Sequence, residues 1–376
     1  QQTRSWLANA AQHMTSRECR ELKRSGTSSL DLEPHEQTLL RAVPVRKALD
    51  GGCRIMRGKD PRAADRCKVV GRIDEFWSYS RHGNHWLAFL NLMLYYNGVP
   101  SLLAGFATAT AAAMILAAAV PEDVVPSQKV GGLFCLLPSL ITSLLVLIFW
   151  HSRRMIFIDQ ACISQDDDTM KRNGILSLGY FLKSSDTMVI LWDPTYFTRL
   201  WCVFEFAAYL KLRTDGLGKH GALVLPSHYG VTTFLALFAT LLYLVFDIAA
   251  ALLEPDEEKL GTSLLEVTME QVYGVAVFAF LLAPLARPVG TVVLGYANQM
   301  SQLQAFTTNE AKCFCCSVSH CHPETRVTID CDRKLIEGSV REWFGTVDAF
   351  DGYVRSELQK HIHSQACLPY LYVIFS

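Results

Sequence analysis

The sequence predicts an α/β protein that combines a parallel β-sheet with a four-helix transmembrane region, and three observations lead to this fold class. Short apolar runs alternate with helical patterns over residues 155–213, as in parallel strands joined by crossover helices. Four long apolar stretches carry almost no charged residues, which is typical of helices that span a bilayer. The chain is also 50% hydrophobic, with a mean hydropathy of +0.18 that is high for a soluble protein.

The first 70 residues are polar and basic, and they show no strong hydrophobic periodicity. We expect residues 1–70 to form a flexible cytoplasmic arm, and contact of this arm with anionic lipid headgroups is the alternative. The formal net charge of the whole chain is −1. Since no strong positive field surrounds the molecule, no nucleic-acid partner is predicted.

Residues 71–98 contain the first strand and helix of the predicted sheet domain. The strand covers residues 74–79, and the segment Ser78-Tyr79-Ser80-Arg81 lies at its carboxyl end. A helix follows at once, because four large apolar residues recur on one helical face: Trp86, Phe89, Met93 and Tyr96. Pro100 separates this helix from the next segment.

Two transmembrane hairpins are predicted, over residues 101–150 and 231–296. Arg153 and Arg154 follow the first hairpin, whereas an acidic connector at residues 254–258 joins the two spans of the second. By the positive-inside rule, this asymmetry places the soluble parts in the cytoplasm. The sequence therefore predicts a multi-pass membrane protein with the lipid bilayer as a partner.

Two charged residues fall inside the second hairpin, Asp247 in the third span and Arg287 in the fourth. Charged groups at membrane depth usually face a partner or a water-filled space. They are interpreted either as part of an ion or proton path or as side chains near an interface that extend towards water. The sequence leaves both interpretations open.

Residues 151–226 form the remainder of the predicted sheet domain. Strands are expected at 155–159, 187–192 and 222–226, and helices at 171–183 and 199–213. We expect the first strand, at 74–79, to lie beside residues 155–158, since an insertion whose ends lie close together does not disturb a sheet. Ligands gather at the carboxyl ends of such strands, which draws attention to Asp159 with its loop and to the loop at residues 193–198.

Glu205 lies in the second turn of the helix at 199–213, among apolar neighbours. A carboxylate in such surroundings either pairs with a nearby arginine or belongs to a functional site. The residues alone favour the structural interpretation without excluding the functional one.

Together these motifs resemble the TIR (Toll/interleukin-1 receptor-like) family, of the plant and bacterial Trp-Cys-x-x-Glu type. The resemblance is carried by the Ser78 to Arg81 segment, by Asp159 with the loop after it, and by Trp201-Cys202-Val203-Phe204-Glu205. It covers about a quarter of the chain. It implies a flavodoxin-like parallel sheet that is split by inserted transmembrane helices.

The resemblance implies two functions, and the membrane charges suggest a third. The first is NAD hydrolysis, in which Glu205 acts at the nicotinamide ribose of the substrate and no prosthetic group is needed. Four residues would bind the dinucleotide: Ser80, Arg81, Trp201 and Asp159. The second is a non-catalytic scaffold that self-associates through the TIR-like domain. The third is a transporter or channel with a regulatory TIR-like domain.

Residues 297–376 form a predicted cytoplasmic tail rich in cysteine and histidine. Zinc is one interpretation, and its candidate ligands are Cys313, Cys316, His320 and Cys321, although no clean pair of C-x-x-C knuckles is present. Acylation of the cysteines at 313–316 and plain reduced thiols are the alternatives. Residues 340–354 carry an apolar stripe that predicts a packing helix.

Overall fold

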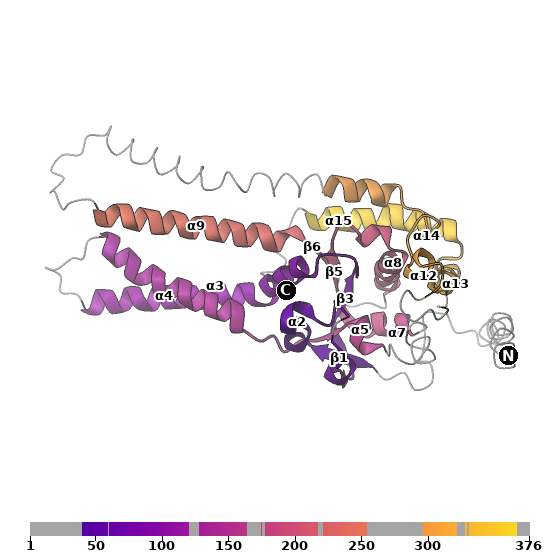
Figure 1. Ribbon diagram of the computed structural model, residues 1–376, viewed down its shortest axis with the longest axis horizontal. Coiled ribbons are helices and arrows are strands. Elements are labelled where there is room, and N and C mark those ends of the chain that lie inside the picture. Colours follow the sequence, from indigo (N-terminus) through magenta and orange to yellow (C-terminus); the bar gives the residue numbers. More distant parts are fainter. Residues whose placement is uncertain are drawn as a thin grey trace.

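The computed structural model describes residues 40–58, 60–119, 128–163, 174, 177–216, 221–253, 296–321, 328 and 331–366. These residues form an α/β domain built on one sheet, from which long helices extend in one direction (Figure 1). The predicted combination of a mostly parallel sheet with long apolar helices is therefore present.

The sheet has six strands in the order β2-β1-β4-β3-β5-β6. Their bounds are β1 (Arg41–Pro44), β2 (Lys68–Val69), β3 (Ile73–Tyr79), β4 (Met155–Phe157), β5 (Ser185–Trp192) and β6 (Ala222–Pro226). Strands β4, β3, β5 and β6 are parallel, whereas β1 is antiparallel to β4 and to β2. The predicted pairing across the insertion is confirmed, because Glu75 lies opposite Ile156. The expected strand at residues 222–226 is confirmed as β6.

The N-terminal region differs from the expected basic arm, because its second half belongs to the folded domain. Strand β1 extends the sheet and is followed by α2 (Val45–Cys53) and the short helix η1 (Ala64–Arg66). Ala42 and Val43 are fully buried. The apolar runs in this region are short and lie between many basic residues, so the sequence pattern does not identify them as strands. They become buried only when they pack against the neighbouring strand. Residues 1–39 lie outside the described part.

Helix α3 (His85–Ala119) continues for 35 residues, and Pro100 lies inside it. The predicted separation of a sheet helix from a first span at residues 98–101 is therefore wrong. Its first turns pack on the sheet through Leu92 and Tyr96, whereas Phe106 further along is 75% exposed. The same helix thus leaves the sheet domain and continues as an apolar helix beyond it.

Two further apolar helices, α4 (Gln128–Phe149) and α9 (His228–Leu253), lie alongside α3 (Figure 1). Ser101 Oγ donates a hydrogen bond to the carbonyl of Ser143 at 2.7 Å, and Ser139 Oγ donates one to the carbonyl of Gly105 at 2.8 Å. A Cβ at Gly105 would come within 2.0 Å of Ser143 Oγ, so only glycine permits this approach. Small residues and hydrogen bonds between helices are typical of packing in membranes.

The sequence predicts four spans, but the described part of the chain contains one helix that is long and apolar enough to cross a membrane. This helix is α3. Its most apolar 18-residue stretch has a mean hydropathy of 1.9, and 11% of that stretch is buried. The apolar stretches described in α4 and α9, at 134–149 and 229–242, are shorter. Apart from Tyr296, the fourth predicted span at 272–296 lies outside the described residues.

The two faces of the sheet are covered by helices from different parts of the chain. Trp77 of β3 contacts Tyr96 of α3, whereas its neighbour Ser78 contacts Glu205 of α8 (Leu200–Thr214). Since successive residues of a strand point to opposite faces, α3 and α8 lie on opposite sides. The side of the sheet that α8 covers also carries two shorter helices, α5 (Asp159–Cys162) and α7 (Leu178–Lys183).

The C-terminal tail packs on the sheet domain and is not a separate segment. Its elements are α12 (Phe314–Ser317), α13 (Asp332–Phe344), α14 (Val347–Tyr353), η4 (Val354–Leu358) and α15 (Gln359–Ala366). The ring of Phe204 lies 5.9 Å from that of Trp343 and 6.4 Å from that of Phe350. His361 Nε2 lies 2.8 Å from the carbonyl of Ala222 in β6. The predicted apolar stripe of the tail is therefore part of the same core.

Candidate functional site

The strand order reverses between β3 and β5. The chain passes from β3 to β4 on one side and then returns to β5 on the other. In open parallel sheets, ligands bind at the carboxyl ends of the strands at such a reversal. The residues at this position are Tyr79 at the end of β3, Ser80 after it, and Asp193 after β5.

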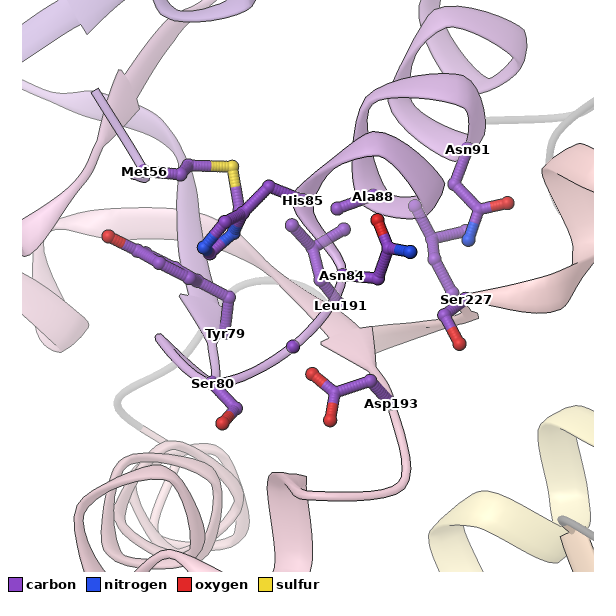
Figure 2. A pocket seen from close by; sticks show the side chains of 12 residues that line it. Met56, Tyr79, Ser80, Asn84, His85, Ala88, Asn91, Leu191, Asp193 and Ser227 are labelled. Carbon is purple, nitrogen blue, oxygen red and sulfur yellow. The ribbon is translucent and has the colours of Figure 1, made fainter. Parts of the chain in front are cut away.

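A shallow cleft opens at this point of the sheet edge (Figure 2). Six of its lining residues are Tyr79, Ser80, Asn84, His85, Leu191 and Asp193. The space between its walls, open solvent included, is about 270 Å³, and the enclosed part has room for roughly one water molecule. A Cβ at Gly83 would come within 2.1 Å of Asp193 Oδ2, so glycine is required where the loop after β3 approaches Asp193.

Hydrogen bonds join the loops that follow β3 and β5. The hydroxyl of Thr195 lies 2.6 Å from Ser80 Oγ and 2.6 Å from Asp193 Oδ1. The backbone N–H of Thr195 also donates to Asp193 at 2.6 Å. Burial raises the pKa of Asp193, and the hydrogen bonds from Thr195 oppose this rise. The floor of the cleft is therefore held in one arrangement by Ser80, Asp193 and Thr195.

Glu205 lies beneath β3, on the face opposite to α3. Ser78 Oγ donates a hydrogen bond to Glu205 Oε2 at 2.6 Å, and the hydroxyl of Tyr196 lies 2.7 Å from Ser78 Oγ. The residue is 4% exposed, and no ion pair to it occurs among the residues that the structure describes. Burial raises the pKa of Glu205 to about 8. The hydrogen bond from Ser78 opposes this rise, and the charge of Asp159 adds to it.

Asp159 and Arg81 form an ion pair at the same edge of the sheet. Arg81 Nη2 lies 2.5 Å from Asp159 Oδ2, and the hydroxyl of Tyr79 donates to Asp159 Oδ1 at 3.0 Å. The side chain of Arg81 remains 49% exposed. This pair links the carboxyl ends of β3 and β4 and leaves part of a cationic group open to solvent.

The structure separates the five predicted site residues into three groups. Ser80 lines the cleft, Arg81 and Asp159 pair at the edge, and Trp201 hydrogen-bonds to Glu205 on the other face of the sheet. Arg81 and Asp159 are near enough to affect the pKa of Glu205, so the groups share one electrostatic environment. They do not line a single cavity.

Sequence reasoning did not single out Ser78 as the partner of Glu205. The alternation of side chains along a strand could have found Ser78, because every second residue of β3 faces the same helix. The expectation that ligands gather at the loop of residues 193–198 agrees with the position of Asp193, which lines the cleft.

The tail brings together a set of metal-binding side chains that differs from the predicted one. The ligand atoms of Cys315, His320 and Cys331 all lie within 4.8 Å of one another. Of the four predicted zinc ligands, His320 belongs to this group, and Cys316 Sγ lies 3.9 Å from Cys315 Sγ. Cys313, Cys316 and Cys321 are not in the group.

Comparisons of the chain with protein-family models, with curated proteins and with solved structures found no match.

Proposed function

We propose that the chain is a membrane-anchored TIR-like signalling protein that hydrolyses NAD at the nicotinamide glycosidic bond, with Glu205 as the catalytic carboxylate. The observation that carries this proposal is the environment of Glu205. Its carboxyl group is buried, is hydrogen-bonded to Ser78 and Trp201, and lacks an ion pair among the described residues. Groups with strongly shifted pKa values concentrate at functional sites.

The raised pKa of Glu205 fits the charge that the reaction develops. At a pKa of about 8, the carboxyl group is mostly protonated at neutral pH. A cation favours the ionised form of a neighbouring carboxyl group, and the nicotinamide ring of NAD is cationic. Cleavage then transfers positive charge to the ribose, where a carboxylate in an apolar site stabilises it. Water completes the hydrolysis and releases nicotinamide, ADP-ribose and a proton.

The arrangement of the parallel strands supports the TIR-like part of the proposal. Across the sheet, the parallel strands lie in the order β4-β3-β5-β6. Counted along the chain, these are the second, first, third and fourth parallel strands, which agrees with the flavodoxin-like arrangement. The Ser78 to Arg81 segment and Asp159 follow the first and second of these strands. The antiparallel strands β1 and β2 take the position beyond β4.

The surface of the long helices supports the membrane part of the proposal. Large apolar side chains are exposed along α3 and α4, among them Leu102, Leu103, Phe106, Met114, Ile141, Leu145 and Ile148. Soluble monomers rarely expose an apolar surface of this extent. Arg153 and Arg154 follow α4 where the chain returns to the sheet, and basic residues at this position support a cytoplasmic sheet domain and tail. The full proposal remains a multi-pass protein with both predicted hairpins in the bilayer.

A non-catalytic scaffold is the second candidate, and one specific observation favours it. The cleft lies on the α3 side of the sheet, whereas Glu205 lies on the α8 side. In this alternative, Glu205 is a neutral core residue and the sheet domain acts by self-association. The transporter interpretation stays a prediction, because the structure describes no side chain at Asp247 or Arg287.

The test uses the full chain in lipid nanodiscs, incubated with NAD and analysed by chromatography for nicotinamide and ADP-ribose. We expect products from the wild type and from Glu357→Gln, a control at an exposed glutamate of the tail. Glu205→Gln should give none while unfolding at a similar temperature. A wild-type protein that is folded and inert towards NAD, and that forms cross-linked oligomers, would establish the scaffold instead.

A further inference from the structure

The tail gathers four metal-binding side chains from α12, from the turn after it and from the start of α13. Cys315, His320 and Cys331 place their ligand atoms within 4.8 Å of one another. Cys316 lies next to this group, with its Sγ 3.9 Å from Cys315 Sγ. In tetrahedral coordination with zinc–sulfur bonds of about 2.3 Å, two sulfurs lie about 3.8 Å apart. The spacing of these thiols therefore suits one ion.

His320 provides an independent observation that points to a missing ligand. Its Nδ1 atom is buried and has no hydrogen-bond partner in the described part of the chain, which is rare for a buried polar atom. Ser319 and His320 have φ angles of +53° and +57°, a conformation that residues other than glycine seldom adopt. The N–H of His320 donates to the carbonyl of Cys315 at 2.7 Å. This tight turn places the imidazole beside the thiols.

The charges around the cluster suit thiolate ligands. Cys331 lies immediately before the first residue of α13, where the helix dipole favours a negative charge. The guanidinium of Arg333 hydrogen-bonds to Cys316 and donates to the carbonyl of Thr308 at 2.6 Å. Three thiolates and a divalent ion leave one negative charge, which Arg333 balances.

We propose that Cys315, Cys316, His320 and Cys331 bind one structural zinc ion. Four protein ligands complete the tetrahedral coordination of zinc and leave no position for a substrate, which is the arrangement of structural sites. The ion ties α12 to the start of α13. This inference goes beyond the proposed function and does not depend on it.

The position of the site indicates what the ion stabilises. Just before α12, the N–H of Lys312 donates to the carbonyl of Thr198 at 2.7 Å, and the N–H of Leu200 donates to the carbonyl of Lys312 at 3.2 Å. These bonds attach the tail to the beginning of α8, the helix that carries Trp201 and Glu205. The zinc site therefore holds the tail against the N-terminal end of that helix.

Acylation of this cluster is less compatible with the structure than metal binding. Cys315 is 0% exposed and Cys313 is 5% exposed, and only Cys316 is half-buried, whereas an acyl transferase needs an accessible thiol. The buried positions instead suit ligands that surround an ion.

The first test measures zinc in the full chain, purified in detergent under reducing conditions. We expect about one zinc ion per chain in the wild type. Cys331→Ser and His320→Ala should lose the metal. Cys321→Ser should keep it, since Cys321 is adjacent to His320 in sequence but is not one of the four proposed ligands. Cys135→Ser in α4 is a remote control for loss of a thiol.

A second test uses wild-type protein alone and so does not depend on how the variants fold. Zinc is removed with a chelator, and Co²⁺ is then added. We expect a thiolate-to-cobalt charge-transfer band, and in variants that fold, the band should weaken in proportion to the number of thiolates removed. Wild-type protein without stoichiometric zinc and without this band would overturn the proposal. So would retention of zinc in Cys331→Ser together with its loss in Cys321→Ser.

Discussion

Two buried glutamates lie on opposite faces of β3, and they differ in how their charge is compensated. Glu75, which is 1% exposed, forms an ion pair with Arg154 and accepts hydrogen bonds from Tyr95 and Tyr96. Glu205 is almost as buried, but its hydrogen bonds come from neutral groups, Ser78 among them. A compensated carboxylate stabilises its surroundings, whereas an uncompensated one can respond to an approaching cation.

The polar network around Glu75 lies where the long helices meet the sheet. Trp77 Nε1 donates to the hydroxyl of Tyr96 at 3.0 Å, which links β3 to α3. Arg154 follows α4 and reaches the same carboxylate. The network therefore attaches both helices of the first hairpin to one strand, which explains a structural role for Glu75 that Glu205 does not share.

The largest expected effect concerns Glu205 and the cleavage of NAD. Glu205→Gln should lower kcat by about 10³-fold, or about 4 kcal/mol, because the amide cannot carry the negative charge that stabilises the transition state. Initial rates of nicotinamide release at saturating NAD would measure this loss. A variant that retains more than a tenth of the wild-type rate would exclude Glu205 as the catalytic carboxylate.

The next effect concerns the partner of Glu75. Arg154→Leu should lower the free energy of unfolding by about 3 kcal/mol, because it leaves a buried carboxylate without its cation. Urea unfolding in detergent would measure the difference. Arg153→Leu is the matched control, since Arg153 is exposed, and it should change stability by less than about 0.5 kcal/mol. Equal effects of the two substitutions would contradict a specific role for the Glu75 ion pair.

A smaller effect concerns the dependence of stability on pH. The pKa of Glu205 is raised from 4.5 to about 8 in the folded protein. Between these values the unfolded chain has released its proton and the folded chain retains it, so the free energy of unfolding falls as pH rises. The slope is at most about 1.4 kcal/mol per pH unit.

Unfolding curves of the wild type and of Glu205→Gln at pH 5, 6, 7 and 8 would isolate this contribution. As pH rises to about 8, we expect Glu205→Gln to gain stability relative to the wild type. Above that pH the difference between the two proteins should stay constant. Parallel curves across this range would show that the carboxyl group is ionised in the folded protein.

The sheet could be predicted from the sequence, but several contacts around it could not. The pairing of residues 74–79 with 155–158 followed from apolar runs that need neighbours on both sides. By contrast, the sequence predicts a boundary at Pro100, but α3 continues through this residue, as prolines in apolar helices often allow. The contact of Phe204 with Trp343 joins segments far apart in the chain, and no local pattern encodes such a meeting.

The candidate site was predictable in its residues and not in its geometry. The motifs identified Glu205 and Trp201, which hydrogen-bond to each other, and also Ser80, which lines the cleft. Which face of the sheet each side chain occupies depends on the register of β3. The zinc ligands show the same limit, because the tertiary fold and not the sequence spacing brings Cys331 beside His320.

The smallest expected effect concerns the hydroxyl of Ser78, which hydrogen-bonds to Glu205. Ser78 donates to this carboxyl group and favours its ionised form. Ser78→Ala should therefore raise the pKa of Glu205 by about one unit, the equivalent of one hydrogen bond. Because kcat/KM reports on groups of the free enzyme, its dependence on pH should move to higher pH by the same amount. The maximal value at high pH should change little.

Ser185→Ala is the matched control for this shift. Ser185 is also a buried serine on a strand of the sheet, but its hydroxyl donates to the carbonyl of Phe181. Its replacement should lower stability by about 1 kcal/mol and leave the pH profile unchanged. If Ser78→Ala behaves like Ser185→Ala, the hydroxyl of Ser78 serves packing alone. Glu205 would then be a structural residue like Glu75, although it has no ion pair among the described residues.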